Sequence, residues 1–71
     1  MDQFVIVSFP DARTVFVDGT PCGPTNEVMI VQRGTHRFTL GDPQDYDPPS
    51  IERLVVGTTE QNPMRLAFTK V

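Results

Sequence analysis

The chain has 71 residues, 38% of them hydrophobic, and a formal net charge of −3. A chain of this length has room for one hydrophobic core, so residues 1–71 are expected to form a single domain. Nucleic-acid-binding domains usually carry a basic stripe, whereas the six Lys and Arg residues are scattered singly among nine acids. The composition therefore argues against nucleic acid as a partner.

The only cysteine is Cys22, so no disulfide can form within the chain. Small secreted domains usually depend on disulfides, and their absence favours a reducing compartment. The N-terminus is acidic, and the apolar stretch at residues 4–9 is too short for a signal peptide. No run reaches the length of a membrane span. We therefore expect a soluble, cytoplasmic protein that does not insert into a membrane.

Prolines and glycines divide the chain into short runs rich in Val, Ile, Phe and Thr, which is typical of β-strands. Strands are expected at residues 3–8, 13–17, 27–32, 36–40, 51–56 and 64–70. Asp18-Gly19 is a strong hairpin-turn pair, and Gly34 suits a turn with positive φ. Residues 20–26 and 41–50 contain several prolines and are expected to be loops. The pattern predicts an all-β fold without significant helix, a small antiparallel β-sandwich of about six to seven short strands.

Side-chain alternation assigns some faces clearly. His36, Phe38 and Leu40 share one face of their strand, opposite Arg37 and Thr39. In the last run Met64, Leu66 and Phe68 are expected to face inward.

Several short motifs resemble the PEGA family of β-sandwich modules, and the resemblance runs from about Pro10 to Phe68. The motifs are the Pro10 turn followed by a strand ending in Val17-Asp18-Gly19, then Gly23-Pro24-Thr25, Gly34-Thr35-His36, Tyr46, and Val55-Val56-Gly57. The chain departs from the family pattern at Ala12-Arg13, where the family has Gly-Ala, at Asn26 in place of proline, and at Asp45 in place of glycine. The resemblance implies a prealbumin-like sandwich without catalytic residues, of a kind commonly appended to larger surface, envelope or signalling proteins. This chain would be a freestanding copy.

No group of residues in the sequence indicates an enzyme or a cofactor. His36 is the only histidine, and we interpret it as structural, hydrogen-bonded to a loop carbonyl. Cys22 has no neighbouring cations to lower its pKa and is interpreted as an ordinary loop cysteine. Asp42, Asp45 and Asp47 could in principle wrap a calcium ion, but the spacing lacks the glycine and glutamate of the helix–loop–helix motif. A solvated loop, in which Tyr46 tucks its ring against the sandwich, is the preferred interpretation.

The first run is apolar on both faces, which suggests an interaction surface. Such a strand is either central or covered on its second face. One interpretation is a central strand buried on one side, with Val5 and Val7 simply exposed on the other. The other is an outward apolar patch that consists of Val5, Val7, Met29, Val31 and Val55. The leading hypothesis is a non-catalytic protein–protein interaction or structural module that binds another protein or itself through a sheet edge or outer face. The alternative is a module that binds carbohydrate or a cell-wall fragment through exposed loops, with Tyr46 as a contact.

Overall fold

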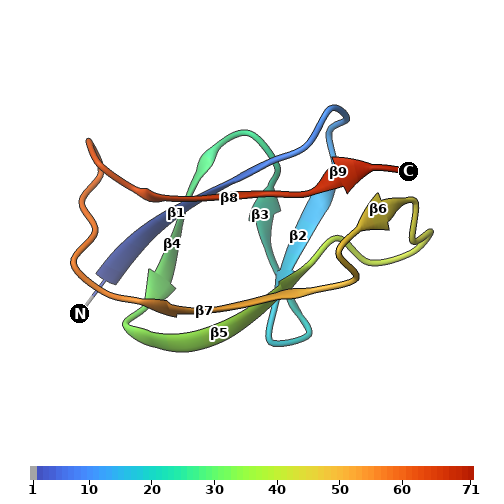
Figure 1. Ribbon diagram of the computed structural model, residues 1–71. Helices are drawn as coiled ribbons and strands as arrows, with labels where there is room; N and C mark the ends of the chain where they lie inside the picture. The colour runs from blue at the N-terminus through green and yellow to red at the C-terminus, as the bar shows by residue number, and fades with distance from the viewer. Residues whose placement is uncertain (1) are drawn as a thin grey trace.

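The computed structural model describes residues 2–71, which form nine β-strands and no helix. The strands are β1 (Asp2–Ser8), β2 (Thr14–Val17), β3 (Thr20–Pro24), β4 (Val28–Gln32), β5 (Gly34–Thr39), β6 (Tyr46–Asp47), β7 (Ile51–Val55), β8 (Met64–Ala67) and β9 (Thr69–Lys70). Sheet A has the order β4-β1-β8, sheet B has the order β3-β2-β5-β7, and a small third sheet pairs β6 with β9 (Figure 1). The predicted all-β sandwich is confirmed.

The Asp18-Gly19 pair forms the expected hairpin turn. Both residues have positive φ, 53° and 83°, and Val17 pairs with Thr20 directly across the turn. This geometry matches the right-handed twist of the two strands, so the chain continues into β3 instead of the predicted loop. The expectation of a loop over residues 20–26 is therefore wrong for β3. Its two prolines are tolerated because β3 is the edge strand of sheet B.

Strand β1 lies in the centre of sheet A and pairs differently on its two sides. It runs antiparallel to β4 and parallel to β8. The purely antiparallel arrangement expected from the sequence is therefore incomplete. A parallel pair needs a long crossover connection, and residues 9–63 separate the two strands in the sequence.

The core lies between the two large sheets. It consists of Val5, Val7, Phe9, Val15, Met29, Val31, Phe38, Leu40, Tyr46, Ile51, Val55, Leu66 and Phe68. The predicted inward positions of Phe38, Leu40, Leu66 and Phe68 are confirmed. The predicted outward patch is wrong, because Val5, Val7, Met29, Val31 and Val55 are all buried.

The side of β1 that faces the core is the one that was predicted to face outward. Two residues near the ends of the strand favour this arrangement. Phe9 continues the alternation of Val5 and Val7 and is buried in the core. Gln3, at the other end, also points inward and is 4% exposed. Its Oε1 accepts hydrogen bonds from the backbone N–H of Thr58, at 3.0 Å, and from the Thr58 hydroxyl, at 2.8 Å. Because these two hydrogen bonds satisfy the buried amide oxygen, burial of Gln3 costs too little free energy to turn the other side of β1 toward the core.

The loop between β5 and β7 contains the two-residue strand β6. Tyr46 is 5% exposed and makes edge contacts with the rings of Phe9 and Phe68. Its hydroxyl donates a hydrogen bond to the carbonyl of Gly41 at 2.9 Å. The interpretation of Tyr46 as a ring tucked against the sandwich is confirmed, and its ring is not available as a platform for a ligand.

Candidate functional site

The outer face of sheet A exposes a contiguous set of apolar side chains. Phe4 and Ile6 on β1 are half-buried, and Val28 and Ile30 on β4 are 44% and 56% exposed. Phe4 pairs with Ile30, and Ile6 pairs with Val28, so the four side chains form two adjacent cross-strand pairs. We call these four residues the outer apolar face.

Polar residues border the outer apolar face at both ends. Asp2 pairs with Gln32 beyond one end, and the side-chain amide of Gln32 lies 3.5 Å from the Asp2 carboxylate. On the other side Arg65 of β8 is the ladder neighbour of Ile6 and is exposed. The acidic group of Asp2 therefore lies at one end of the apolar surface, and the basic group of Arg65 lies beside its other end, on β8.

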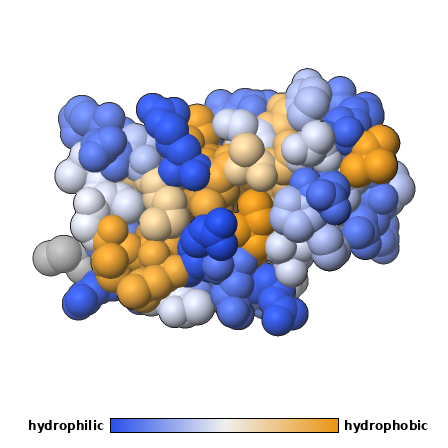
Figure 2. All heavy atoms as spheres, viewed as in Figure 1, coloured by the Kyte–Doolittle hydropathy of each residue, from blue (hydrophilic) through white to orange (hydrophobic). Residues whose placement is uncertain are grey.

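A second apolar spot lies on β7 of sheet B. Leu54 and Val56 are 58% and 38% exposed. Figure 2 shows hydrophobic side chains gathered at the lower left, over the end of β7. Leu54 pairs with Thr35, and the neighbouring positions Glu52 and Arg53 are charged. This spot is therefore smaller and more polar in its surroundings than the outer apolar face.

One edge of sheet A is strand β4, and its outward backbone carbonyls have side-chain partners. The N–H of Phe4 bonds to the Thr58 hydroxyl, away from β4, so its partner Ile30 directs its carbonyl outward from the sheet edge. The Cys22 thiol lies 3.7 Å from that carbonyl oxygen. The carbonyl of Gln32, two residues on, lies 2.6 Å from Nε2 of His36. Side chains of sheet B therefore cover the backbone oxygens along the β4 edge.

Cys22 is exposed on β3, and burial of its thiol raises its pKa. A raised pKa keeps the sulfur protonated and weakly nucleophilic at neutral pH. This result agrees with the interpretation of an ordinary structural cysteine, although the residue lies in a strand and not in a loop.

His36 bonds through both ring nitrogens. Nδ1 lies 2.6 Å from Oδ2 of Asp18, and Nε2 lies 2.6 Å from the carbonyl oxygen of Gln32. A histidine paired with aspartate is the base–orienter half of a catalytic triad, but in a triad the second nitrogen faces a nucleophilic hydroxyl. Here it faces a backbone carbonyl. The geometry agrees with the predicted structural role of His36, although the carbonyl belongs to the last residue of strand β4 and not to a loop. The second contact, with the Asp18 carboxylate, was not predicted from the sequence.

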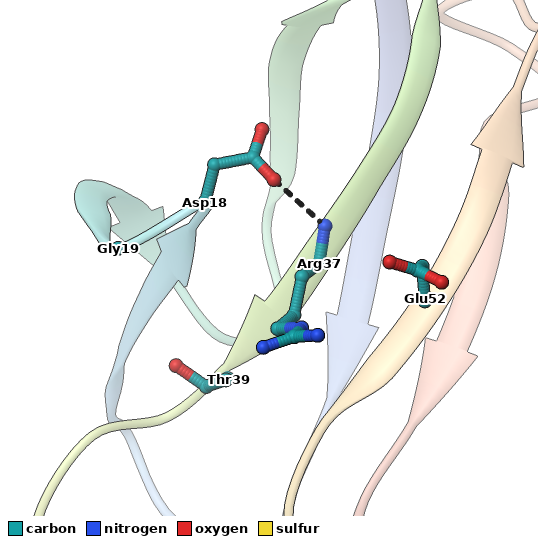
Figure 3. A pocket seen from close by; sticks show the side chains of 5 residues that line it. All are labelled: Asp18, Gly19, Arg37, Thr39 and Glu52. Carbon is teal, nitrogen blue, oxygen red and sulfur yellow. Dashed lines mark hydrogen bonds between the residues drawn. The ribbon is translucent and has the colours of Figure 1, made fainter.

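An open polar hollow of about 520 Å³ lies on the outer face of sheet B, lined by Asp18, Gly19, Arg37, Thr39 and Glu52. Figure 3 shows these side chains, with the Asp18 carboxylate accepting the backbone N–H of Arg37 at 3.0 Å. The lining mixes both signs of charge and contains no aromatic ring. It can offer hydrogen bonds to a small polar molecule but no apolar platform.

The acidic loop is organised by Arg13 from inside the fold. Its guanidinium donates to Oδ1 of Asp45 at 2.6 Å and to the carbonyls of Leu40, Gly41 and Pro43 at 3.1, 3.3 and 2.9 Å. It also lies 5.6 Å from the centroid of the Tyr46 ring. Of the three loop carboxylates considered for calcium, the one on Asp45 is therefore engaged by the arginine. The same contact holds the pKa of Asp45 below its usual value.

Comparisons with protein-family models, with curated proteins and with solved structures found no match. The resemblance to the PEGA family therefore stays a prediction. Within residues 2–71, no group of three or more His, Cys, Asp or Glu side chains is arranged to hold a metal ion. In the same part of the chain no helix has the length and apolar composition of a membrane span.

The positions that depart from the PEGA pattern have physical explanations. Arg13 and Asp45 contact each other, so two departures are accounted for by one ion pair. Asn26 has a φ of 66°, which proline cannot adopt. Its side-chain amide also bonds both backbone groups of Phe9, at 3.1 and 2.8 Å.

Proposed function

We propose that this domain is a non-catalytic protein–protein interaction module and that its contact surface is the outer apolar face. The observation that carries the proposal is the pair of β-branched side chains, Val28 and Ile30, left 44% and 56% exposed beside Phe4 and Ile6. Contiguous apolar surface bordered by polar residues is characteristic of interaction sites. The outer face of sheet B carries Leu54 on β7 beside charged and hydroxyl side chains such as Arg37, Thr39 and Glu52.

A second copy of the chain is the partner that this surface fits best. A two-fold axis that lies parallel to the face and perpendicular to the strands reverses the strand direction, so the Asp2 end of one copy meets the end of the other copy that Arg65 borders. The acidic and basic borders then become complementary at both ends of the interface. Apolar side chains would pack in the centre, with two ion pairs at the rim.

The size of the face sets the expected affinity. Sheet A has three strands spaced at about 4.8 Å, and its longest strand, β1, has seven residues. Its outer face therefore spans at most roughly 15 by 23 Å, or about 350 Å² on each partner. Stable dimers usually bury about 800 Å² on each side. We therefore expect a weak dimer that dissociates on dilution, unless a neighbouring edge adds to the contact.

The test combines sedimentation equilibrium with a ¹H–¹⁵N NMR dilution series on the wild type and two variants. Ile30→Lys places a charge in the outer apolar face. Leu54→Lys is the matched control, because Leu54 is equally exposed on a strand of the other sheet. We expect concentration-dependent shifts at β1 and β4 in the wild type and in Leu54→Lys, and their loss in Ile30→Lys. A wild type that stays monomeric at millimolar concentration, with no shift at β1 or β4, contradicts the self-associating form.

Binding of a small polar ligand is the second candidate, and the polar hollow on sheet B is the observation that favours it. Tyr46 no longer supports this alternative, because its ring is buried. Hydrogen-bonding groups at Asp18, Arg37 and Glu52 line the hollow and could bind sugar hydroxyls. NMR titration with short oligosaccharides distinguishes the candidates. Localised shifts at these residues support ligand binding, whereas shifts confined to β1 and β4 on self-dilution support the interaction module.

We also propose that the chain is a divergent PEGA domain that works in the cytoplasm. What supports the first part is the Asp18-Gly19 turn and the positive φ of Gly34, 139°, both at positions that the family pattern shares. The residues that depart from the family pattern have structural contacts of their own: Arg13 pairs with Asp45, and Asn26 bonds the backbone of Phe9. Fractionation of the native cell, followed by detection of the endogenous protein, tests the location.

A further inference from the structure

The two contacts of His36 require two donors on the ring. Both partners, the Asp18 carboxylate and the Gln32 carbonyl, are acceptors, and each lies 2.6 Å from a ring nitrogen. A neutral imidazole carries one N–H, whereas an imidazolium carries two. The observed geometry is therefore satisfied only when the ring is protonated. A neutral ring would place a nitrogen lone pair against an oxygen at hydrogen-bond distance.

The three residues come from different parts of the sandwich. Asp18 lies in the hairpin turn that joins β2 to β3 in sheet B, and it is fixed there by a hydrogen bond from its N–H to the carbonyl of Arg37 at 2.8 Å. Gln32 is the last residue of β4, an edge strand of sheet A. His36 lies in β5 between them and links the two sheets at this corner.

We propose that His36 is a proton-controlled clasp: its imidazolium fastens the end of β4 to sheet B, and loss of one proton releases the Gln32 carbonyl at that edge. The remaining proton stays on Nδ1, because a charged carboxylate is a stronger acceptor than a carbonyl. Release opens the sheet edge beside the outer apolar face, where an unpaired carbonyl can accept a strand. The clasp does not depend on the proposed partner, since it is a property of the isolated chain.

Of the charged groups around the ring, the Asp18 carboxylate is in contact with it and favours the protonated form. Asp18 faces the ring from the turn between β2 and β3, and its hydrogen bond with His36 is the main cause that raises the pKa of His36. Arg53 lies opposite His36 on β7, with its guanidinium turned to the carbonyl of Glu52 at 2.9 Å. Arg37 adjoins the ring in sequence and lines the hollow, and Arg33 lies in the exposed turn before β5. Asp2 faces the Gln32 side chain from β1.

The pH range of the clasp follows from these shifts. A raised pKa in the folded state means that the contribution of His36 is complete below about pH 6.5, the ordinary value for histidine, and is lost as the pH rises through the raised pKa. The same hydrogen bond lowers the pKa of Asp18, so its contribution is present above the ordinary value near 3.8 and is lost as the pH falls through the lowered one. The clasp is closed between these limits.

The experiment follows His36 by NMR in the full chain, because it is the only histidine and its ring signals need no assignment strategy. We expect a pKa above that of free histidine, two protonated ring nitrogens below it, and the Nδ1–H tautomer above it. Hydrogen exchange of the β4 amides, corrected for the intrinsic effect of pH, should become roughly tenfold faster once the ring is neutral. The loss of one hydrogen bond to a charged group changes a local opening equilibrium by about this factor.

Two variants separate the clasp from a general effect of charge. Asp18→Asn removes the carboxylate charge and should lower the pKa of His36 toward or below its ordinary value. Glu52→Gln removes a carboxylate from the same hollow without a contact to the ring, and should leave the pKa unchanged. A wild-type pKa at or below that of free histidine, or β4 exchange that does not respond to it, overturns the proposal. These two wild-type measurements decide the outcome even if Asp18→Asn does not fold.

Discussion

The outer faces of sheet A and sheet B differ in the polarity of their exposed side chains. On sheet A the exposed positions, Val28 and Ile30, have apolar neighbours on both strands of the ladder. On sheet B the exposed positions of β5 and β7 include Arg37 and Glu52, which face each other across the ladder and line a polar hollow. The outer face of sheet A is therefore apolar over two adjacent cross-strand pairs, whereas on sheet B the exposed Leu54 lies on the same side of β7 as Glu52.

The comparison also separates two kinds of stabilisation. Sheet A depends on the burial of its inner side chains, with few directed contacts on its outer face. The rim of sheet B depends on hydrogen bonds with defined donors, such as the guanidinium of Arg13 and the ring of His36. Substitutions should therefore act through burial in the first region and through unsatisfied polar groups in the second.

The largest effect is expected from a charge on the inner side of β1. Val5 is fully buried, so Val5→Asp places a carboxylate in the core and should destabilise the fold by about 3 kcal/mol or more. Urea unfolding followed by circular dichroism measures the loss, and a chain of this size has little stability to spare. Ile30→Asp, on the outer face of the neighbouring strand, is the control and should cost under about 1 kcal/mol. Equal losses in the two variants would show that both sides of sheet A are buried in solution.

The next effect is expected at Arg13. Arg13→Met keeps much of the apolar stem but leaves the carboxylate of Asp45 and three loop carbonyls without their donor. Hydrogen bonds to charged groups contribute about 1.5–3 kcal/mol each, and some of these oxygens regain water, so we expect a net loss of about 2–3 kcal/mol. Thermal unfolding measures it. Arg65→Met, at an exposed position of β8, should change the stability by less than about 0.5 kcal/mol. A similar result for both arginines would mean that the loop does not depend on the guanidinium.

Much of the fold could be predicted from local patterns. The turn at Asp18-Gly19 and the clean alternation of residues 36–40 lead to one interpretation each, because glycine chemistry and a two-sided polarity difference leave no competing register. The faces of β1 could not be predicted in this way. Val5 and Val7 on one side are nearly as apolar as Phe4 and Ile6 on the other, so alternation alone gives no preference.

The deciding information for β1 lies far away in the sequence. Gln3 is buried because Thr58, 55 residues later, satisfies its side chain. The predicted surface was misplaced for the same reason, since Val5, Val7, Met29 and Val31 lie on the inner sides of β1 and β4, whose outer sides form the outer apolar face. The contact between Arg13 and Asp45 is also long-range, and neither residue carries a local signal for the other. The one local clue lies just beyond the strand, where the apolar Phe9 extends the alternation of Val5 and Val7 by one more residue.

A smaller effect is expected at Gly41, which lies next to the ring of Phe16. Gly41 has a φ of 73°, and a Cβ there would lie 2.7 Å from the ring of Phe16, so Gly41→Ala combines backbone strain with a clash. We expect a loss of about 1–3 kcal/mol. Gly57 has a φ of 68° and open space around it, so Gly57→Ala measures the backbone strain alone, about 1 kcal/mol. The difference between their denaturation midpoints measures the cost of the clash between the added methyl group and the Phe16 ring. No difference would mean that its ring moves aside freely.

The smallest effect is expected in the acid limb of the stability curve. The Arg13 guanidinium lowers the pKa of Asp45, so the contribution of this carboxylate is present above its ordinary pKa near 3.8 and disappears as the pH falls through the lowered value. Asp45→Asn should reduce the stability at neutral pH and flatten the decline below pH 4, measured by thermal unfolding across pH 2–7. Asp47→Asn removes a carboxylate from the same loop at an exposed position and is the matched control. If the two variants have the same acid limb, Arg13 holds the loop through its carbonyls and not through the ion pair.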